Sequence, residues 1–495
     1  MSAFTDDRNR HIIPRWRSFH RTALTSETYC LNPGIPRPPF DFRDKLTQWQ
    51  DNPTLSFAAD LLGTAIAVGE GPEARVAAEA LLADTRADFA CVRSLAERFL
   101  APEKWLPNAD CPEFINSAYI HGLKVALCAY AHNPIGWSDL SLAYESLGFR
   151  RQADRAMRVA LTLGPTNRYI LRCASRLYHH HDEYGHAHQI LLSSGLAAHD
   201  PWIAAAEIAA AGVTGRKSRY VKSSRDKVLR GTFSAGQVTE LASAVGTAEF
   251  VSGKRKRAKD LLQMSLDQPT ENAIAQAAWV VRRAPEMGLY SLQSEMNRSP
   301  EAKAWQDWVQ GNWDNGLRET ERWLADQPFS SKPAVVGSYL ASGILSEHAR
   351  GARICNAGLI ANPANFGLLN NLACAEAYLG NTAKAVSTFE RIDRRALDPI
   401  ELVVWTATSG LLAFRQGHAM PGRLLYMKAM EDAASVGDQA LVALAALHLA
   451  LEELASGVTT ASSTVQMAVL KAKAVERADV QWITERVVSR AGLQA

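Results

Sequence analysis

The sequence predicts an all-α fold, a superhelical solenoid built from antiparallel helix pairs. Two spacings predict it: small residues recur at intervals of 35, 34 and 37 residues, and prolines recur at intervals of 35 and 36. The residues in these two series are Gly316, Gly351, Ala385 and Gly422, and Pro328, Pro363 and Pro399. Strand signals are nearly absent, with no alternating Val/Ile/Thr run and no Asn-Gly hairpin. A period of this length is typical of arrays in which each unit is one helix pair.

Length and composition set the broad class. The 495 residues are too many for one small core, and 47% hydrophobic with 21% charged residues excludes a mostly disordered chain. The net charge is +3, so no overall charge extreme dictates a partner. The seven cysteines form no Cys-x-x-Cys, which favours reduced thiols over a disulfide framework or a zinc site.

Membrane and export signals are weak. The first residues contain no apolar run long enough for a secretory signal. The longest apolar stretch, 440–454, is interrupted by His448 and two glutamates, and it is too short to span a membrane. We therefore expect a soluble cytoplasmic protein that does not bind membranes.

One segment, 133–165, shows a complete helix pair. Two runs of residues spaced for one helical face are separated by Gly148 and closed by Pro165. The facing residues are Trp137, Leu140, Ser141, Tyr144, Ala153, Met157 and Ala160. This pattern resembles the tetratricopeptide repeat (TPR), with Met157 where the family usually has an aromatic residue. The resemblance implies that the first helix of each pair lines a concave peptide-binding face.

Two further segments resemble the repeat, and together the matches cover about 132–430. In one, Leu369, Leu372, Ala373, Gly380, Ala385, Phe389 and Ile392 fill the signature positions, with Glu376 where Tyr is usual. In the other, the matching residues are Gly410, Gly417, Gly422, Tyr426 and Ala429. Several other units are degenerate.

The chain divides into five expected regions. These are an N-terminal extension with a basic arm and a proline-rich stretch, divergent helical pairs, repeats that carry a basic block, further repeats, and a C-terminal helical cap. Their bounds are 1–52, 53–131, 132–270, 271–430 and 431–495. We expect the cap to show a more polar outer face.

No catalytic or cofactor motif is found, so we predict a protein that is not an enzyme and has no cofactor. The densest candidate ligands are the histidines of 179–188, His179, His180, His181, His186 and His188. Neighbouring histidines on a helix point about 100° apart and cannot all bind one ion. We favour a solvated polar turn over a metal site.

The concave face supplies the first candidate partner-binding residues. The repeat register places Trp305 and Trp308 on that face, where Trp is a frequent hot-spot residue. The alternative is that both fill the core. Asn370 and Asn371 fall near the same face, where an amide can hold a peptide backbone through its donor and its acceptor. Their alternative is an exposed pair at a helix start. Only Asn371 matches the clamp with which some TPR proteins grip a C-terminal carboxylate, so we do not expect that type of clamp.

A basic block supplies the second candidate. From Arg216 to Lys259 the chain has 12 Lys/Arg and 3 Asp/Glu, a net +9, so the remainder carries −6. The candidate polyanion ligands are Arg216, Lys217, Arg219, Lys222, Arg225, Lys254, Arg255, Lys256 and Arg257. Such a block attracts nucleic acid, but it also fits an acidic protein, an acidic face of this chain, or a solvated surface.

The N-terminal arm, 8–21, is the third candidate. It has five arginines and no acidic residue. It could dock on nucleic acid, on a partner or across the helices of its own chain. We expect Ile12, Ile13, Trp16 and Phe19 to pin it rather than leave it free.

The resemblance and the missing motifs together predict a non-catalytic scaffold or adaptor that binds a protein or peptide on the concave face. The alternatives are a nucleic-acid-associated regulator that uses 216–259, and a regulatory subunit of a separately encoded enzyme. The sequence does not fix the oligomeric state.

Overall fold

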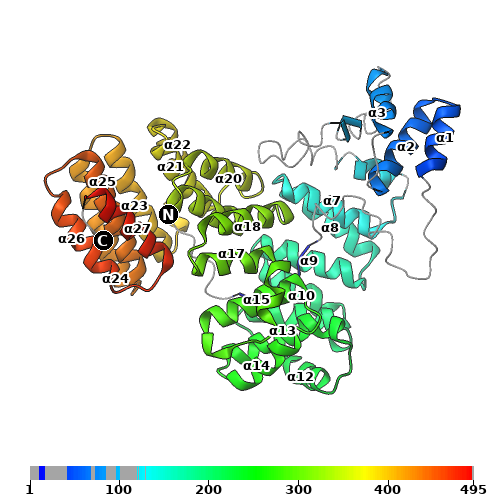
Figure 1. Ribbon diagram of the computed structural model, residues 1–495. Helices are drawn as coiled ribbons and strands as arrows, with labels where there is room; N and C mark the ends of the chain where they lie inside the picture. The colour runs from blue at the N-terminus through cyan, green and yellow to red at the C-terminus, as the bar shows by residue number, and fades with distance from the viewer. Residues whose placement is uncertain are drawn as a thin grey trace. The chain divides into compact units, whose positions relative to one another are not determined.

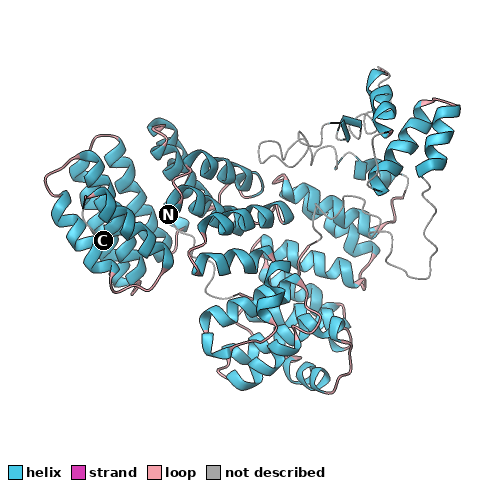
Figure 2. Ribbon diagram, viewed as in Figure 1, coloured by secondary structure: helices cyan, strands magenta, loops and turns pink. Residues whose placement is uncertain are grey.

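The computed structural model describes residues 10–16, 42–68, 73–84, 96–97, 99–100, 120, 122–128 and 130–492. The regular structure in these residues is helical, with no strand (Figure 2). The chain forms two compact units, one of Met1–Trp16, His132–Leu324 and Pro328–Ala495, the other of Arg17–Ala131 and Ala325–Gln327. The expected proline-rich stretch at 32–40 and Phe19 of the arm lie outside the described residues.

The smaller unit contains the first helices of the chain (Figure 1). They are α1 (Phe42–Asp51), α2 (Leu55–Val68) and α3 (Ala74–Ala83). Phe42, Leu61, Leu62 and Ala77 pack into one apolar cluster at their interface.

The larger unit is a row of helix pairs, as the sequence predicts. The N-terminal pairs are α7 (Pro134–Ser146) with α8 (Arg150–Leu163), α9 (Arg168–His180) with α10 (Tyr184–Ser193), α11 (Pro201–Val213) followed by α12 (Val221–Leu229), α13 (Ala235–Val251) with α14 (Arg255–Met264), and α15 (Glu271–Arg283) followed by the short α16 (Leu292–Glu295). The C-terminal pairs are α17 (Pro300–Val309) with α18 (Trp313–Asp326), α19 (Ser331–Ser338) with α20 (His348–Ala361), α21 (Phe366–Tyr378) with α22 (Thr382–Glu390), α23 (Pro399–Arg415) with α24 (Ala419–Ser435), and α25 (Gln439–Ser456) with α26 (Ala461–Ala472). In most pairs the two helices pack against each other, so the predicted solenoid of antiparallel pairs is confirmed.

Local sequence sets where these helices begin. Asn133, Asn167 and Asp200 each accept hydrogen bonds from two backbone N–H groups at the start of α7, α9 and α11. The predicted small residues lie near the start of a second helix and are buried, namely Ala153, Gly316, Gly351, Ala385 and Gly422. Ala187 of α10 and Ala258 of α14 occupy the same place in their pairs. The 34-residue spacing therefore reports the close approach of the second helix to the first.

The chain ends in α27 (Ala478–Arg490), which packs on α25 and α26 and also reaches α17. Between α19 and α20 the chain makes a π-helical turn, η7 (Tyr339–Ile344). Trp482 and Arg486 of α27 donate to carbonyl oxygens in this turn, at 3.1 Å to Ile344 and 3.0 Å to Gly343. The C-terminal helix is thus fastened about 140 residues back along the chain.

Among the described helices, α25 alone is long and apolar enough to cross a membrane by length and composition. It runs 18 residues, slightly longer than the apolar stretch seen in the sequence, and 72% of it is buried. Its neighbours are α23, α24, α26 and α27. This environment is typical of a core helix in a folded domain.

Candidate peptide-binding site

The arm, defined from here on as residues 10–16, lies extended across helices of its own larger unit. Ile12 is 1% exposed and packs with apolar residues of α11 and α13, including Ile208 and Leu241. Trp16 is 4% exposed, and its ring meets Phe329 edge-on with centroids 5.7 Å apart. Ile12 and Trp16 therefore pin the arm, and of the three destinations left open by the sequence the arm takes its own helices.

Arg10 is held by four hydrogen bonds to side chains that α15 and α17 position. Its Nε and Nη2 donate to the two carboxylate oxygens of Glu301, at 2.9 and 3.0 Å. Its Nη1 donates to Gln276 Oε1 at 2.6 Å, and its Nη2 also donates to Asn272 Oδ1 at 3.1 Å. The guanidinium thus donates to both oxygens of Glu301, the bidentate arrangement in which arginine binds a carboxylate most strongly, and to two amide oxygens as well.

The same two amides also hold the backbone of the arm. Asn272 Nδ2 donates to the carbonyl of Ile13 at 2.8 Å, and Gln276 Nε2 donates to the carbonyl of Arg10 at 2.8 Å. Asn272 and Gln276 are one helical turn apart on α15, so their side chains leave the same face. Each amide uses its donor and its acceptor, which is how a side-chain amide recognises an extended peptide.

Arg15 adds a second cation to the same carboxylates. It donates to Glu271 at 2.7 Å and to Glu301 at 3.1 Å. Burial alone would raise the pKa of Glu301, but the charge and hydrogen bonds of Arg10 and the charge of Arg15 outweigh burial and hold it well below its ordinary value. Glu301 also lies in the first turn of α17, where the helix dipole favours a negative charge.

A glycine gives the arm room to approach α11. A Cβ built on Gly212 would lie 2.6 Å from the imidazole of His11. Any larger residue at 212 would push this part of the arm away. The surface formed by Gly212, Glu271, Asn272, Gln276 and Glu301 is called the arm site below.

The histidine cluster is not the solvated polar turn that we expected. His179, His181 and His188 are each 7% exposed. His180 and His181 donate to the buried Glu145 of α7, at 3.2 and 2.9 Å. The prediction considered only the 100° angle between neighbouring side chains on one helix. It did not foresee that Glu145, from the preceding helix pair, would pair with His180 and His181 in the interior. Among the described residues, no group of three His, Cys, Asp or Glu is placed to hold a metal ion.

Burial and these contacts move pKa values in the cluster. Burial alone would raise the pKa of Glu145, but the hydrogen bonds from His180 and His181 lower it to about 2. Burial lowers the pKa of His179 to about 4, against the opposing effect of its 2.6 Å hydrogen bond to the Ser175 carbonyl. His179 is therefore neutral at physiological pH.

The predicted residues of the concave face lie mostly inside the fold. Trp308 is 5% exposed and stacks on Tyr339 with centroids 5.4 Å apart. Trp305 is half-buried, with the Arg282 guanidinium 4.5 Å from its ring. Asn370 and Asn371 are 0% exposed rather than an exposed pair at a helix start. A partner-binding role for these four residues stays a prediction.

The sequence predicted that the amides of Asn370 and Asn371 would hold a peptide backbone. In the structure a different amide pair does so. Asn272 and Gln276 hold an extended backbone, and sequence reasoning missed them together with Glu271 and Glu301. A signal was present, because two amides one turn apart interrupt the otherwise apolar run of α15. The N-terminal segment 8–21, with five arginines and no acid, also indicated acidic partners elsewhere in the chain.

The first run of the basic block lies in the turn before α12 and on α12, and the second lies at the start of α14. Arg225 and Lys254, one from each basic run, both pair with Glu249, at 3.2 and 3.0 Å. Arg255 pairs with Glu286 at 2.6 Å, and Arg219 donates to the Tyr220 hydroxyl at 2.8 Å. The exposed members are Arg216, Lys217, Arg219, Lys222, Lys254, Arg255, Lys256 and Arg257. Polyanion binding by this block stays a prediction.

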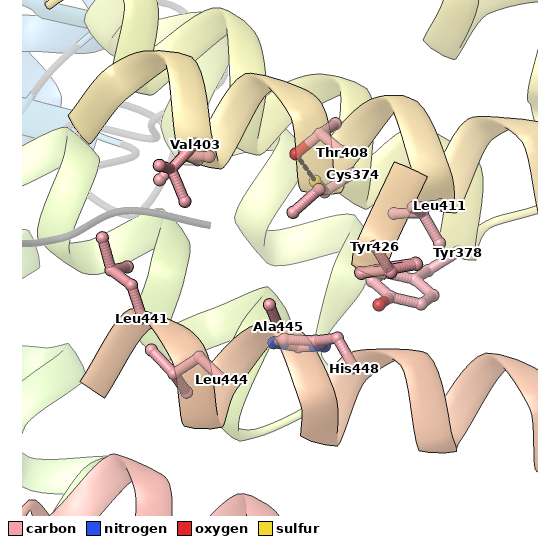
Figure 3. Close-up of a pocket in the computed structure, with 12 residues that line it drawn as sticks. Cys374, Tyr378, Val403, Thr408, Leu411, Tyr426, Leu441, Leu444, Ala445 and His448 are labelled. Atoms are coloured by element: carbon pink, nitrogen blue, oxygen red, sulfur yellow. Dashed lines mark hydrogen bonds between the residues drawn. The ribbon is translucent and has the colours of Figure 1, made fainter. Parts of the chain in front are cut away.

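A small pocket opens between α21, α23, α24 and α25 (Figure 3). Apolar side chains form most of its lining, with Cys374, Thr408 and His448 as polar members. The Cys374 sulfur and the Thr408 hydroxyl lie 3.6 Å apart. Burial, with a contribution from the charge of Arg486, lowers the pKa of His448 to about 3. The lining offers no cluster of charged groups that would mark a catalytic centre.

The fold and these contacts define the class of protein. It is a TPR-like α-solenoid in which an N-terminal segment lies on α11, α13, α15 and α17, the first helices of their pairs. No protein-family model matches the sequence, and no curated protein matches it.

Three solved structures are similar. Yeast Tom70 shares 13% identity at a TM-score of 0.30, covering 76% of this chain and 91% of that chain. The anaphase-promoting-complex hetero-tetramer Cut9–Hcn1 shares 14% at 0.38, covering 94% and 98%. Naa15/Naa10 bound to HypK-THB shares 11% at 0.23, covering 91% and 90%. Likeness at this level carries no argument about function, and the fold assignment rests on the helix pairs of this chain itself.

Proposed function

We propose that this protein is a non-catalytic interaction scaffold that binds a protein partner through an extended segment seated in the arm site. The observation that carries the proposal is the way residues 10–16 are held: two backbone carbonyls by Asn272 and Gln276, and two arginines by acids. This is recognition of a peptide by its main chain and its side chains together. The resemblance to tetratricopeptide repeats is consistent with it, and we place the protein in the cytoplasm as part of the same proposal.

The arm then acts as a built-in competitor. Tethering keeps its effective concentration at its own site high. A partner segment must therefore bind more tightly than the arm, or arrive when the arm has left. Weak capture by the wild-type chain is an expected consequence.

Affinity capture from the native cell tests this function. The baits are the full wild-type chain, the arm-released chain Arg10→Ala with Arg15→Ala, and the arm-released chain that also carries Asn272→Ala and Gln276→Ala. We expect a discrete protein to be enriched by the second bait, to survive nuclease treatment, and to be lost from the third. Equal recovery by all three baits would contradict binding at the arm site.

A second candidate function rests on Glu249. By pairing with both Arg225 and Lys254, it brings the two basic runs to one region of the surface. Such a surface would bind nucleic acid with steep salt dependence. We expect the triple variant Lys217→Ala, Lys222→Ala and Lys256→Ala to reduce both the affinity for duplex DNA and its salt slope. Partners that vanish on nuclease treatment in the capture experiment would favour this candidate.

A further inference from the structure

We infer that the arm site is an arginine-reading site, which takes from a protein partner an extended segment with arginines five positions apart and a large apolar residue between them. The inference rests on the proposed function and names the chemistry of the partner. The pattern is read from the present occupant, in which Arg10 and Arg15 flank Ile12 and Trp16 follows directly.

The contacts to Arg10 require a guanidinium. Three of its nitrogens donate four hydrogen bonds, which both oxygens of Glu301 and two amide oxygens accept. A lysine ammonium is a compact point charge with three donors, so it cannot make these four hydrogen bonds. A lysine in the same place would leave acceptors on Asn272 or Gln276 unpaired and buried, which is costly.

The burial of Glu301 requires that the occupant be cationic. Its side chain is only 11% exposed, and it pairs with Arg10 and Arg15 of the arm, while the charge of Lys332 on α19 makes a smaller contribution to its low pKa. If the arm leaves and nothing replaces it, the buried carboxylate loses both of its arginine partners and keeps only the smaller effect of Lys332, a state that is unfavourable. The site therefore selects for a positively charged replacement.

The apolar contacts fix the register of the occupant. Ile12 enters the cluster formed by α11 and α13, and the Trp16 ring packs against Phe329. The backbone of the arm makes a tight turn at Ile12, where the Ile13 N–H donates to the His11 carbonyl at 2.8 Å, so the segment is not a regular strand and its side chains follow the contacts above. A matching segment therefore needs an apolar residue two positions after the first arginine and an aromatic residue one position after the second.

The site is independent of the arm that fills it. Among the described residues, the arm takes part in one backbone–backbone hydrogen bond, between Ile13 and His11 within the arm itself. It holds to the helices through side chains, so exchanging it for another segment breaks no helical hydrogen bond. The recognising groups belong to α11, α15 and α17, not to the arm.

Peptide binding to the full-length chain tests the inference. The probe is a fluorescein-labelled peptide with the sequence of residues 10–16, followed by fluorescence anisotropy. We expect the arm-released chain (Arg10→Ala with Arg15→Ala) to bind it at least about tenfold more tightly than the wild-type chain does, because the tethered arm no longer competes. We expect a peptide with Arg10→Lys to bind that chain at least about tenfold more weakly.

Matched protein variants locate the binding. In the arm-released chain, Glu301→Gln should weaken peptide binding at least about tenfold, because the buried carboxylate is the counter-charge. Glu286→Gln is the control, since its carboxylate is 63% exposed and pairs with Arg255 outside the arm site. The arm-released chain that carries Glu286→Gln should bind the peptide with the same affinity as the arm-released chain without it.

The outcomes separate the two proposals. Equal binding of the Arg10→Lys peptide would overturn the arginine-reading inference and leave the arm site as a peptide site. A folded arm-released chain that binds no peptide would overturn both. If the arm-released chain does not fold, the variant Gly212→Leu replaces it, because a larger residue at 212 displaces His11 by steric contact. The probe is then a peptide with His11→Gly, which leaves space for the leucine. Weaker binding of that peptide when it also carries Arg10→Lys supports the inference, and equal binding overturns it.

Discussion

Single residues decide how the arm is held, and Glu301 is the main one. Two arginines converge on its carboxylate, and all three side chains are at most 15% exposed. The sequence predicts that the arm is pinned and names Ile12 and Trp16 correctly. It cannot name Glu301, which is 291 positions from Arg10, because only the folded row of helices brings the two together.

Removing this charge should destabilise the whole chain. We expect Glu301→Gln to lower the free energy of unfolding by about 3 kcal/mol, since two arginines lose their shared counter-charge in a buried place. Urea denaturation measures the change. Glu286→Gln serves as the control and should change stability by less than about 0.5 kcal/mol, because its carboxylate is exposed. Equal effects of the two changes would contradict the role given to Glu301.

His448 should make stability depend on pH. Its pKa in the folded chain is about 3, below the ordinary value of 6.5, so the unfolded chain binds more protons and stability falls as pH drops below about 6.5. Replacing it with leucine removes this loss. We expect the stability of His448→Leu relative to wild type to rise by about 2 kcal/mol between pH 8 and pH 5.

Urea denaturation at the two pH values gives the comparison for His448. His132→Leu, at an exposed position, is the control and should show no such pH dependence. A stability difference for His448→Leu that is the same at pH 8 and pH 5 would mean that His448 is not held neutral in the fold.

At the scale of helices, the contact between α23 and α24 shows why small residues recur at a fixed spacing. A Cβ on Gly422 would lie 2.5 Å from the Phe414 ring and 2.9 Å from the carbonyl of Gly410. Gly410 and Gly422 were both identified from the sequence as repeat positions. The spacing was readable because each close crossing needs a small residue at a fixed place.

Gly422→Ala should therefore destabilise, although alanine is the better helix former. We expect a net loss of about 2 kcal/mol from the forced separation of the two helices. Gly185→Ala is the matched control, because Gly185 lies in α10 with nothing within 4 Å of its added Cβ. That change should stabilise the chain by about 0.5 kcal/mol. Thermal unfolding of both variants tests the contrast.

The fastening of α27 to the π-helical turn η7 was beyond sequence reasoning. The carbonyls of Gly343 and Ile344 bond to side chains about 140 positions later, and no local pattern announces such a pairing. The C-terminal region was predicted as helical, and it is, but its attachment depends on the tertiary fold.

Cutting this link should release the C-terminal helix alone. Arg486 donates to Gly343, Ile344 and Ser346, so Arg486→Ala leaves two carbonyls with fewer donors. We expect amide hydrogen exchange in 478–490 to accelerate at least about tenfold, while exchange in α23 stays unchanged. Unchanged exchange in 478–490 would show that packing on α25 and α26 is sufficient.

At the scale of the whole molecule, the sequence predicts the fold of helix pairs but does not predict the binding site for the arm. The 34-residue spacing predicts the row of helix pairs because every pair repeats the same contact. The occupied arm site could not be predicted in this way. It depends on one segment near the N-terminus meeting α11, α15 and α17, and repeat statistics carry no information about such a unique contact.

The central claim is that the arm and a partner segment compete for one site. The most direct measurement is hydrogen exchange at residues 10–16 of the full wild-type chain, with and without a saturating excess of the peptide of the same sequence. We predict that exchange in the arm rises when the peptide binds, and that the Arg10→Lys peptide at the same concentration produces a much smaller rise. If arm exchange stays the same while the peptide is bound, the two occupy different places and the claim fails.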